Sequence, residues 1–385
     1  MKLYTDGFAM NGETDIVKIL FAENPAVLIQ VADRQSEAVE KILDEAGVKY
    51  FPVGCPQEER VVMLTHDGAE HLFGIDYLRD VWYEPSYLLD CLQSGERCAA
   101  MRFNNYKAQP IRYALPRAFK GRVEERPAEG RPLAAIIREK GVNSDREMAR
   151  SLYLAGFDVR DVHMTDLMSG RETLDDVSMI VFCGGFSNSD VLGSAKGWAS
   201  GFVWNENARA ALDRFYARED TLSLGVCNGC QLMIALGLIK PKDGDTAKMP
   251  RMDHNVSHKF ESQFTGVNIP ANDSVMFGSL SGTRMGVWVA HGEGRFVIPG
   301  SIDRFNVIAR YNYKQYPGNP NGSAGAVAGI ASPDGRHVAI MPHPERSIFP
   351  WQCGYYPRAR RNDEATPWLQ GFVNARKWIQ ARKNY

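Results

Sequence analysis

Mostly apolar segments alternate with amphipathic segments through the middle of the chain, and this alternation limits the possible folds more than any other feature. The segments 133–137 (LAAII), 177–183 (VSMIVFC) and 221–226 (TLSLGV) have the composition of buried strands. The segments 144–155 and 205–217 show apolar residues at helical spacing. Strands buried on both faces are typical of parallel sheets that helices cover. We therefore predict an α/β domain with a mostly parallel sheet and helices on both faces.

The flanking regions predict further elements. Strands are expected at 158–163 and, after residue 250, at 274–277, 285–291, 294–298, 307–311, 326–331 and 337–341, followed by a helix at 367–381. The first part of the chain predicts strands at 26–31, 49–53, 60–65 and 70–74, and helices at 36–46 and 79–92. We expect three parts: a small α/β unit at 1–92, a basic, proline-containing connector at 93–132, and the main domain at 133–385.

The charge balance and the cysteine content argue against several classes of protein. The 385 residues include 45 Lys and Arg against 46 Asp and Glu, so the net charge is −1. That balance argues against nucleic-acid binding driven by bulk charge. No segment has the composition of a membrane span, and the N-terminal residues lack the apolar region of a secretory signal. Seven cysteines spread over the chain fit the reduced thiols of a cytoplasmic protein.

The sharpest motif is GVCNG around Cys227, directly after the predicted strand 221–226. A G-x-C-x-G sequence between a strand and a helix is typical of a nucleophile elbow, because the glycines allow a sharp turn. The helix dipole favours a thiolate there, and the following amide, that of Asn228, can donate to an oxyanion. Two other interpretations stay open: Cys227 is a buried structural residue, or it forms a C-x-x-C redox pair with Cys230.

A histidine suited to serve this nucleophile follows the predicted strand 337–341. His343 precedes Pro344, which favours an extended backbone, and residues two apart in an extended chain point the same way. Glu345 can therefore orient the imidazole, and Cys227, His343 and Glu345 form a candidate triad. The alternative is a surface His-Pro-Glu turn. No Cys, His and carboxylate set completes a metal site, so no metal is expected.

A glycine pair, Gly184 and Gly185, follows the predicted strand 177–183. Its backbone N–H groups can point at a developing oxyanion, although an ordinary tight turn has the same sequence. The sequence contains no G-x-x-x-x-G-K-[ST] motif and no G-x-G-x-x-G motif between a strand and a helix. We therefore expect neither an ATP site nor another cofactor in this chain.

Two motifs together resemble those of class I glutamine amidotransferases: GVCNGCQ at 225–231 and MPHPER at 341–346. With FCGGFSNSDVLGSAKGWA, VAHGEGR and NPNGS, residues 133–385 resemble the glutaminase domain of the large, single-chain phosphoribosylformylglycinamidine synthases. Residues 15–120, with RDVWYEPSYLLD and NNYKAQP, resemble the region upstream of that domain. The resemblance implies that 1–92 is the end of a synthase domain and that the chain is a C-terminal fragment.

The resemblance implies a role for each candidate residue. Cys227 would attack the glutamine amide, His343 would act as base and acid, and Glu345 would orient the histidine. The glycine loop and the amide after the nucleophile would form the oxyanion hole. Gln231 and the loops around Ser257 and Gly292 would contact the bound glutamine. The implied substrate-binding residues are Gly184, Gly185, Asn228, Gln231, Ser257 and Gly292.

The implied activity is hydrolysis of glutamine to glutamate and ammonia through a cysteine thioester. The ammonia would serve the ATP-dependent conversion of formylglycinamide ribonucleotide to formylglycinamidine ribonucleotide in purine biosynthesis. ATP and Mg²⁺ would bind the missing synthase part, and the partners would be glutamine and the synthase domains. Two alternatives remain: an intracellular cysteine peptidase or stress protein on the same fold, and a non-catalytic scaffold with a vestigial elbow.

Overall fold

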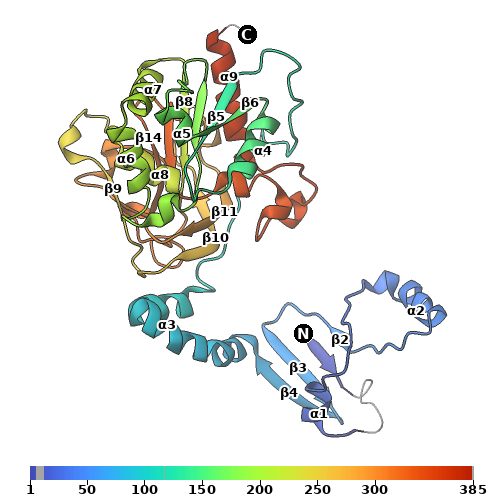
Figure 1. Cartoon of the computed structure of the whole chain (residues 1–385). Helices are drawn as coiled ribbons and strands as arrows, with labels where there is room; N and C mark the ends of the chain where they lie inside the picture. Colours follow the sequence, from blue (N-terminus) through green and yellow to red (C-terminus); the bar gives the residue numbers. More distant parts are fainter. Residues whose placement is uncertain (6–12, 117, 384–385) are drawn as a thin grey trace. The chain divides into compact units, whose positions relative to one another are not determined.

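The computed structural model describes residues 1–5, 13–116 and 118–383, which fall into two compact units, Met1–Leu89 and Asp90–Tyr385. The first unit holds a four-stranded sheet in the order β2-β1-β3-β4, drawn in blue in Figure 1. Its elements are β1 (Lys2–Tyr4), α1 (Ile16–Leu20), α2 (Ser36–Glu45), β2 (Gly54–Cys55), β3 (Val61–His66) and β4 (Ala69–Gly74). β1 is parallel to β3, and the other pairs are antiparallel. The strands predicted at 60–65 and 70–74 and the helix predicted at 36–46 are confirmed.

Two strands predicted in this unit are wrong. Residues 26–31 have no regular secondary structure, and Val27 and Leu28 are 87% and 74% exposed. Residues 49–53 form no strand either, and the two-residue β2 follows them. An apolar, β-branched sequence favours an extended backbone, but a strand also needs a partner for its hydrogen bonds. In the described sheet, no strand pairs with 26–31, and 49–53 takes part only through the Val53 carbonyl, which accepts from the Tyr4 amide of β1 at 2.9 Å.

The helix predicted at 79–92 exists but is longer than predicted. α3 spans Ile75–Asn105 and is interrupted at Gly95, whose φ of 77° and ψ of 151° are not helical. Glycine has no Cβ atom and accepts this positive φ at little steric cost. Residues of α3 from Asp90 onward belong to the second unit.

The second unit is built on a nine-stranded sheet in the order β11-β10-β13-β14-β15-β8-β7-β5-β6. The strands from β15 to β6 are parallel, and those from β11 to β15 pair antiparallel. Their bounds are β5 (Leu133–Arg138), β6 (Asp158–His163), β7 (Met179–Phe182), β8 (Leu222–Val226), β10 (Glu261–Asn268), β11 (Arg284–His291), β13 (Asn306–Tyr311), β14 (Val327–Ala331) and β15 (His337–Ile340). A separate antiparallel pair joins β9 (Arg251–Asp253) and β12 (Arg295–Val297). The predicted α/β domain is confirmed.

Helices cover this sheet on both sides, with α4 and α9 on one side and α6 and α7 on the other (Figure 1). The helices are α4 (Asp145–Ala155), α5 (Met164–Met168), α6 (Lys196–Trp204), α7 (Glu206–Ala217), α8 (Asn228–Ala235) and α9 (Pro367–Lys383). Phe182 of β7 packs edge-on against Trp198 and Phe202 of α6, with ring centroids 5.8 and 6.0 Å apart. None of the helices described is long and apolar enough to cross a membrane.

One strand predicted in this unit is wrong, and two strands, β9 and β10, were not predicted. Residues 274–277 form a turn, from which Met276 and Phe277 point into the core and are fully buried. Their apolar sequence therefore reflects burial, which a short run cannot assign to a strand by itself. The sequence of β10 (ESQFTGVN) is largely polar, so it carries no apolar signal.

Candidate active site

Cys227 lies in the sharp turn between β8 and α8, at the carboxyl end of a parallel strand. Its φ of 52° and ψ of −106° are strained for a residue with a side chain, as is typical of a nucleophile elbow. Its amide donates to the Ile340 carbonyl at 2.9 Å, and its carbonyl accepts from the Gln231 amide at 3.0 Å. The turn is thus held by a strand on one side and a helix on the other.

The flanking glycines are required by close packing. A Cβ atom on Gly229 would lie 2.0 Å from the backbone oxygen of Phe182, and one on Gly225 would lie 2.5 Å from the backbone oxygen of Gly229. Backbone atoms cannot withdraw from such contacts without moving the strand or the helix. The G-x-C-x-G motif therefore fits the turn for a steric reason.

His343 follows β15, the strand next to β8 in the sheet. The two strands are parallel, with Ile340 opposite Val226, so Cys227 and His343 leave the same edge. His343 Nδ1 and Glu345 Oε1 are 2.6 Å apart, and both side chains are buried. The extended backbone predicted here is wrong: His343 has φ −101° and ψ 85°, and Pro344–Arg346 form a turn of 3-10 helix. This turn, rather than an extended chain, places the carboxylate beside the imidazole.

The imidazole and the candidate nucleophile flank Gly184. A Cβ atom on Gly184 would lie 2.7 Å from His343 Cε1 and 3.3 Å from Cys227 Cβ. The Cys227 thiol donates to the Ala290 carbonyl at 3.4 Å, while His343 Nε2 is buried and has no hydrogen-bond partner within the described residues. The second ring nitrogen is therefore available to the thiol.

The charges of Glu345 and His343 shift each other's pKa toward the ionised form of both side chains. Burial would lower the pKa of His343, but Glu345 and the charge of Cys227 outweigh burial and raise the pKa to about 9. Burial would raise the pKa of Glu345, yet the net shift is downward because His343 is protonated beside it. An imidazolium next to a cysteine stabilises its thiolate, which is the nucleophilic form.

The glycine loop after β7 is fixed by residues 140–143. The Asn143 amide donates to Gly184 O at 2.8 Å, and a Cβ on Gly185 would lie 2.5 Å from Val142 Cα. Among the described residues, the Gly185 amide donates no hydrogen bond. The amide of Asn228 lies in the first turn of α8, where no intrahelical acceptor exists. An oxyanion hole at these amides stays a prediction.

Asn228 and Gln231 connect α8 to two neighbouring loops. Asn228 Oδ1 accepts from the Ser187 amide at 3.2 Å, and its Nδ2 donates to Gln231 Oε1 at 3.1 Å. Gln231 Nε2 donates to the Glu293 carbonyl at 2.8 Å. Both polar ends of Gln231 are therefore engaged within the protein, and its direct contact with a substrate stays a prediction.

Ser257 and Gly292 lie in two loops that Asn255 joins. The Asn255 amide donates to Gly292 O at 2.8 Å, and its side chain donates to His291 O at 2.6 Å and accepts from the Gly294 amide at 3.1 Å. The Ser257 hydroxyl donates to Glu261. Sequence reasoning named Ser257 and missed Asn255, because a buried asparagine in a loop has no distinguishing pattern.

The C-x-x-C interpretation finds no support in the geometry. Cys230 is fully buried in α8, and burial raises its pKa well above the usual value. Thiol–disulfide exchange needs an accessible thiolate, which this position does not offer. Within the part of the chain that the structure describes, no group of three or more His, Cys, Asp and Glu side chains is arranged to hold a metal ion.

Known proteins share this domain. Residues 131–379 match the CobB/CobQ-like glutamine amidotransferase domain family. The phosphoribosylformylglycinamidine synthase of Homo sapiens is 39% identical over 94% of this chain and 29% of that protein. The probable phosphoribosylformylglycinamidine synthase, chloroplastic/mitochondrial, of Arabidopsis thaliana is 38% identical over 97% of this chain and 28% of that protein. The solved structure of PurLQS from Thermotoga maritima is 25% identical, with a TM-score of 0.49 over 66% of this chain and 100% of that chain.

The chain therefore spans less than a third of the length of these two curated relatives. The family match includes the turn at Cys227, the glycine loop at Gly184 and the strand end at His343, so it contains every candidate residue of the site. Since the match covers more than half of the sequence, the chain belongs to the glutamine amidotransferase family.

Proposed function

We propose that this chain hydrolyses the side-chain amide of glutamine to glutamate and ammonia, with Cys227 as nucleophile. One observation carries the proposal: Cys227 and His343 flank the same glycine, and Glu345 lies 2.6 Å from the imidazole. This is the arrangement that acyl transfer to a thiol requires, namely a nucleophile, a base and a group that orients the base.

The geometry supports a two-step reaction. The Cys227 sulfur adds to the amide carbon, and the N–H groups of Gly185 and Asn228 stabilise the oxyanion. Loss of one such donor typically costs about 100- to 1,000-fold in rate. The tetrahedral intermediate collapses when ammonia leaves with a proton from His343, and a γ-glutamyl thioester remains. His343 then takes a proton from water, which hydrolyses the thioester to glutamate and restores the thiol.

We further propose that the ammonia serves formylglycinamidine ribonucleotide synthesis from formylglycinamide ribonucleotide. The names of the two curated relatives support this, as does their match over nearly the whole chain, including residues upstream of the amidotransferase domain. ATP and Mg²⁺ would bind in synthase domains outside this chain, in the cytoplasm. The first unit would then be the end of such a domain, and its exposed apolar residues, such as Val27 and Trp82, fit that role.

A glutamine-mimicking electrophile tests the nucleophile directly. We expect diazo-oxo-norleucine to form one adduct on the chain, which mass spectrometry maps to Cys227, and we expect glutamine to protect against it. The variant Cys227→Ser should take up none, whereas Cys230→Ser should be labelled like the wild type. An adduct at another residue, or equal loss in both variants, would contradict the proposal. A cysteine peptidase would not be protected by glutamine.

A further inference from the structure

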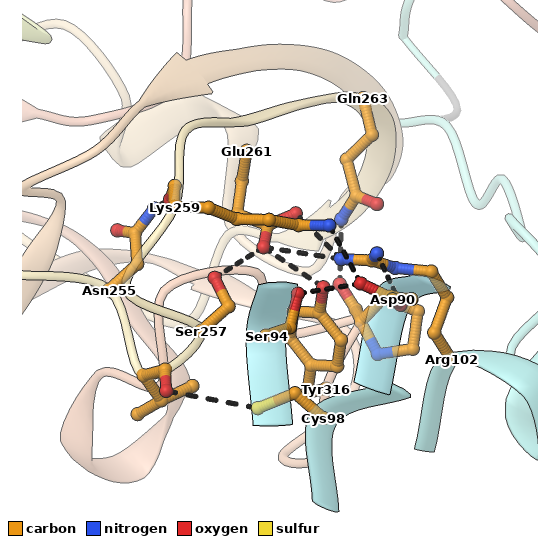
Figure 2. Close-up of polar contacts among 12 residues, drawn as sticks. Asp90, Ser94, Cys98, Arg102, Asn255, Ser257, Lys259, Glu261, Gln263 and Tyr316 are labelled. Atoms are coloured by element: carbon orange, nitrogen blue, oxygen red, sulfur yellow. Dashed lines mark hydrogen bonds and ion pairs between the residues drawn. The ribbon is translucent and has the colours of Figure 1, made fainter. Parts of the chain in front are cut away.

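Four side chains of α3 face the segment 255–261 of the amidotransferase site in Figure 2. They belong to the part of α3 within the second unit, and α3 ends before residue 131, where the family match begins. They are Asp90, Ser94, Cys98 and Arg102. These four α3 side chains therefore contact the amidotransferase domain from a part of the chain that the family match does not include.

Asp90 is the first anchor of this contact. Its side chain is 7% exposed and accepts from Ser94 Oγ at 2.6 Å, Arg102 Nη1 at 2.7 Å and Lys259 Nζ at 2.9 Å. Burial alone would raise the pKa of Asp90, but these donors outweigh burial and lower it. Asp90 is thus an ionised, buried carboxylate that joins α3 to the loop residue Lys259.

Glu261 at the start of β10 is the second anchor. Its side chain is 6% exposed, and Oε1 accepts from Ser257 Oγ at 2.5 Å and from the Tyr316 hydroxyl at 2.9 Å. Arg102 Nη2 lies 3.3 Å from both carboxylate oxygens, and the guanidinium stacks over the Tyr316 ring at 4.9 Å. One guanidinium therefore bridges two buried carboxylates from segments far apart in the sequence (Figure 2).

Hydrogen bonds connect the bridged carboxylate Glu261 and its neighbours to the loops that are candidates for glutamine binding. Glu261 is paired with His291 across the sheet, and the Asn255 side chain joins the Lys259 carbonyl at 3.0 Å to the His291 carbonyl at 2.6 Å. The next residues of that loop include Glu293, whose carbonyl accepts from Gln231 on the nucleophile helix. A shift of the 255–261 segment would therefore move the loop that contacts α8.

We propose that Arg102, held by Asp90, is a positioning residue that fixes the 255–261 and 291–294 loops for glutamine binding. This inference rests on the proposed glutaminase function. Without the guanidinium, Asp90 would keep its ion pair with Lys259, whereas Glu261 would lose its ion pair with Arg102. A buried carboxylate without a paired cation is costly. The 255–261 segment would then move so that the Glu261 carboxylate reaches water, or Glu261 would take up a proton and its hydrogen bonds with Ser257 and Tyr316 would change.

The test measures the rate of Cys227 labelling by diazo-oxo-norleucine against its concentration, on the full 385-residue chain. For Arg102→Met we expect the half-saturating concentration to rise about tenfold or more, as loss of a hydrogen bond to a charged group predicts. The maximal rate, and the rate with iodoacetamide, which makes no contacts of a glutamine analogue, should change little. Arg102→Lys keeps the charge but not the two-armed geometry, so it should lie between.

Arg97→Met is the matched control, because Arg97 is exposed on the same helix and should behave like the wild type. If Arg102→Met fails to fold by circular dichroism, the double variant Arg102→Met/Glu261→Gln removes the uncompensated charge and is measured instead. An unchanged half-saturating concentration in folded Arg102 variants would overturn this inference alone. A wild-type chain that is not labelled at Cys227 would overturn the proposed function and this inference with it.

Discussion

The two units of the chain bury their secondary structure to very different extents. In the second unit, β8 is buried at every one of its five residues and β7 at every one of its four. In the first unit, β4 is exposed at all six residues and α2 has no buried residue. The fold of the second unit is therefore stabilised by a sheet that helices cover on both faces. In the first unit, few of the described residues cover the sheet.

The same difference bears on which strands could be recognised in the sequence. Strands that are buried on both faces appear in the sequence as short apolar runs. The strands at 133–137, 177–183 and 221–226 were predicted from such runs. In the first unit, the apolar run at 26–31 predicted a strand that the structure does not contain. Apolar composition alone does not decide: 60–65 and 70–74 do form strands in the open sheet of the first unit, and 274–277 forms a buried turn in the covered second unit.

The largest effect is expected from removing a buried ring of the covered sheet. Phe182→Ala should lower the free energy of unfolding of the second unit by about 3–5 kcal/mol, because it removes contacts with Trp198 and Phe202 and leaves a cavity. Hydrogen exchange of β8 amides, followed by mass spectrometry, measures this change. The matched variant in the first unit is Leu72→Ala on β4, where Leu72 is 65% exposed. It should change stability by less than about 0.5 kcal/mol. Similar effects in the two units would refute the comparison.

The candidate triad was predictable for a related reason. Cys227 and His343 each follow an apolar strand, and adjacent parallel strands bring their ends to one edge. The contact of Arg102 with Glu261 was not predictable, because the two residues are 159 positions apart and neither lies in a distinctive local pattern. Local patterns locate strand ends, but pairing between distant charged side chains depends on the complete fold.

The second prediction concerns charge inside the covered unit. His343 has its pKa raised from 6.5 to about 9, whereas burial lowers the pKa of His291 to about 3. A raised pKa means that protonation of His343 stabilises the fold fully below pH 6.5, and this stabilisation is lost as the pH rises through about 9. The Glu345→Gln variant lacks the negative charge that contributes most to raising the pKa of His343. Burial should then bring this pKa well below about 9.

Histidine NMR titration measures this shift. The control is Glu37→Gln on the exposed helix α2, which should leave the His343 titration unchanged. A Glu345→Gln variant in which His343 still titrates near the wild-type pH would show that the carboxylate does not set its charge. Labelling of Cys227 at neutral pH should fall in the same variant, because a neutral imidazole no longer stabilises the thiolate.

The smallest effect is expected where the sequence prediction failed. Val27→Thr and Leu28→Gln should each change the free energy of unfolding by less than about 0.5 kcal/mol, because both side chains are exposed and in no strand. Urea unfolding of the full chain, monitored by circular dichroism, measures this. A buried strand would respond differently, since removal of an apolar side chain from a core costs about 2–5 kcal/mol. A loss of that size would mean that 26–31 packs within this chain after all, and the contrast between an open first unit and a covered second unit would no longer hold.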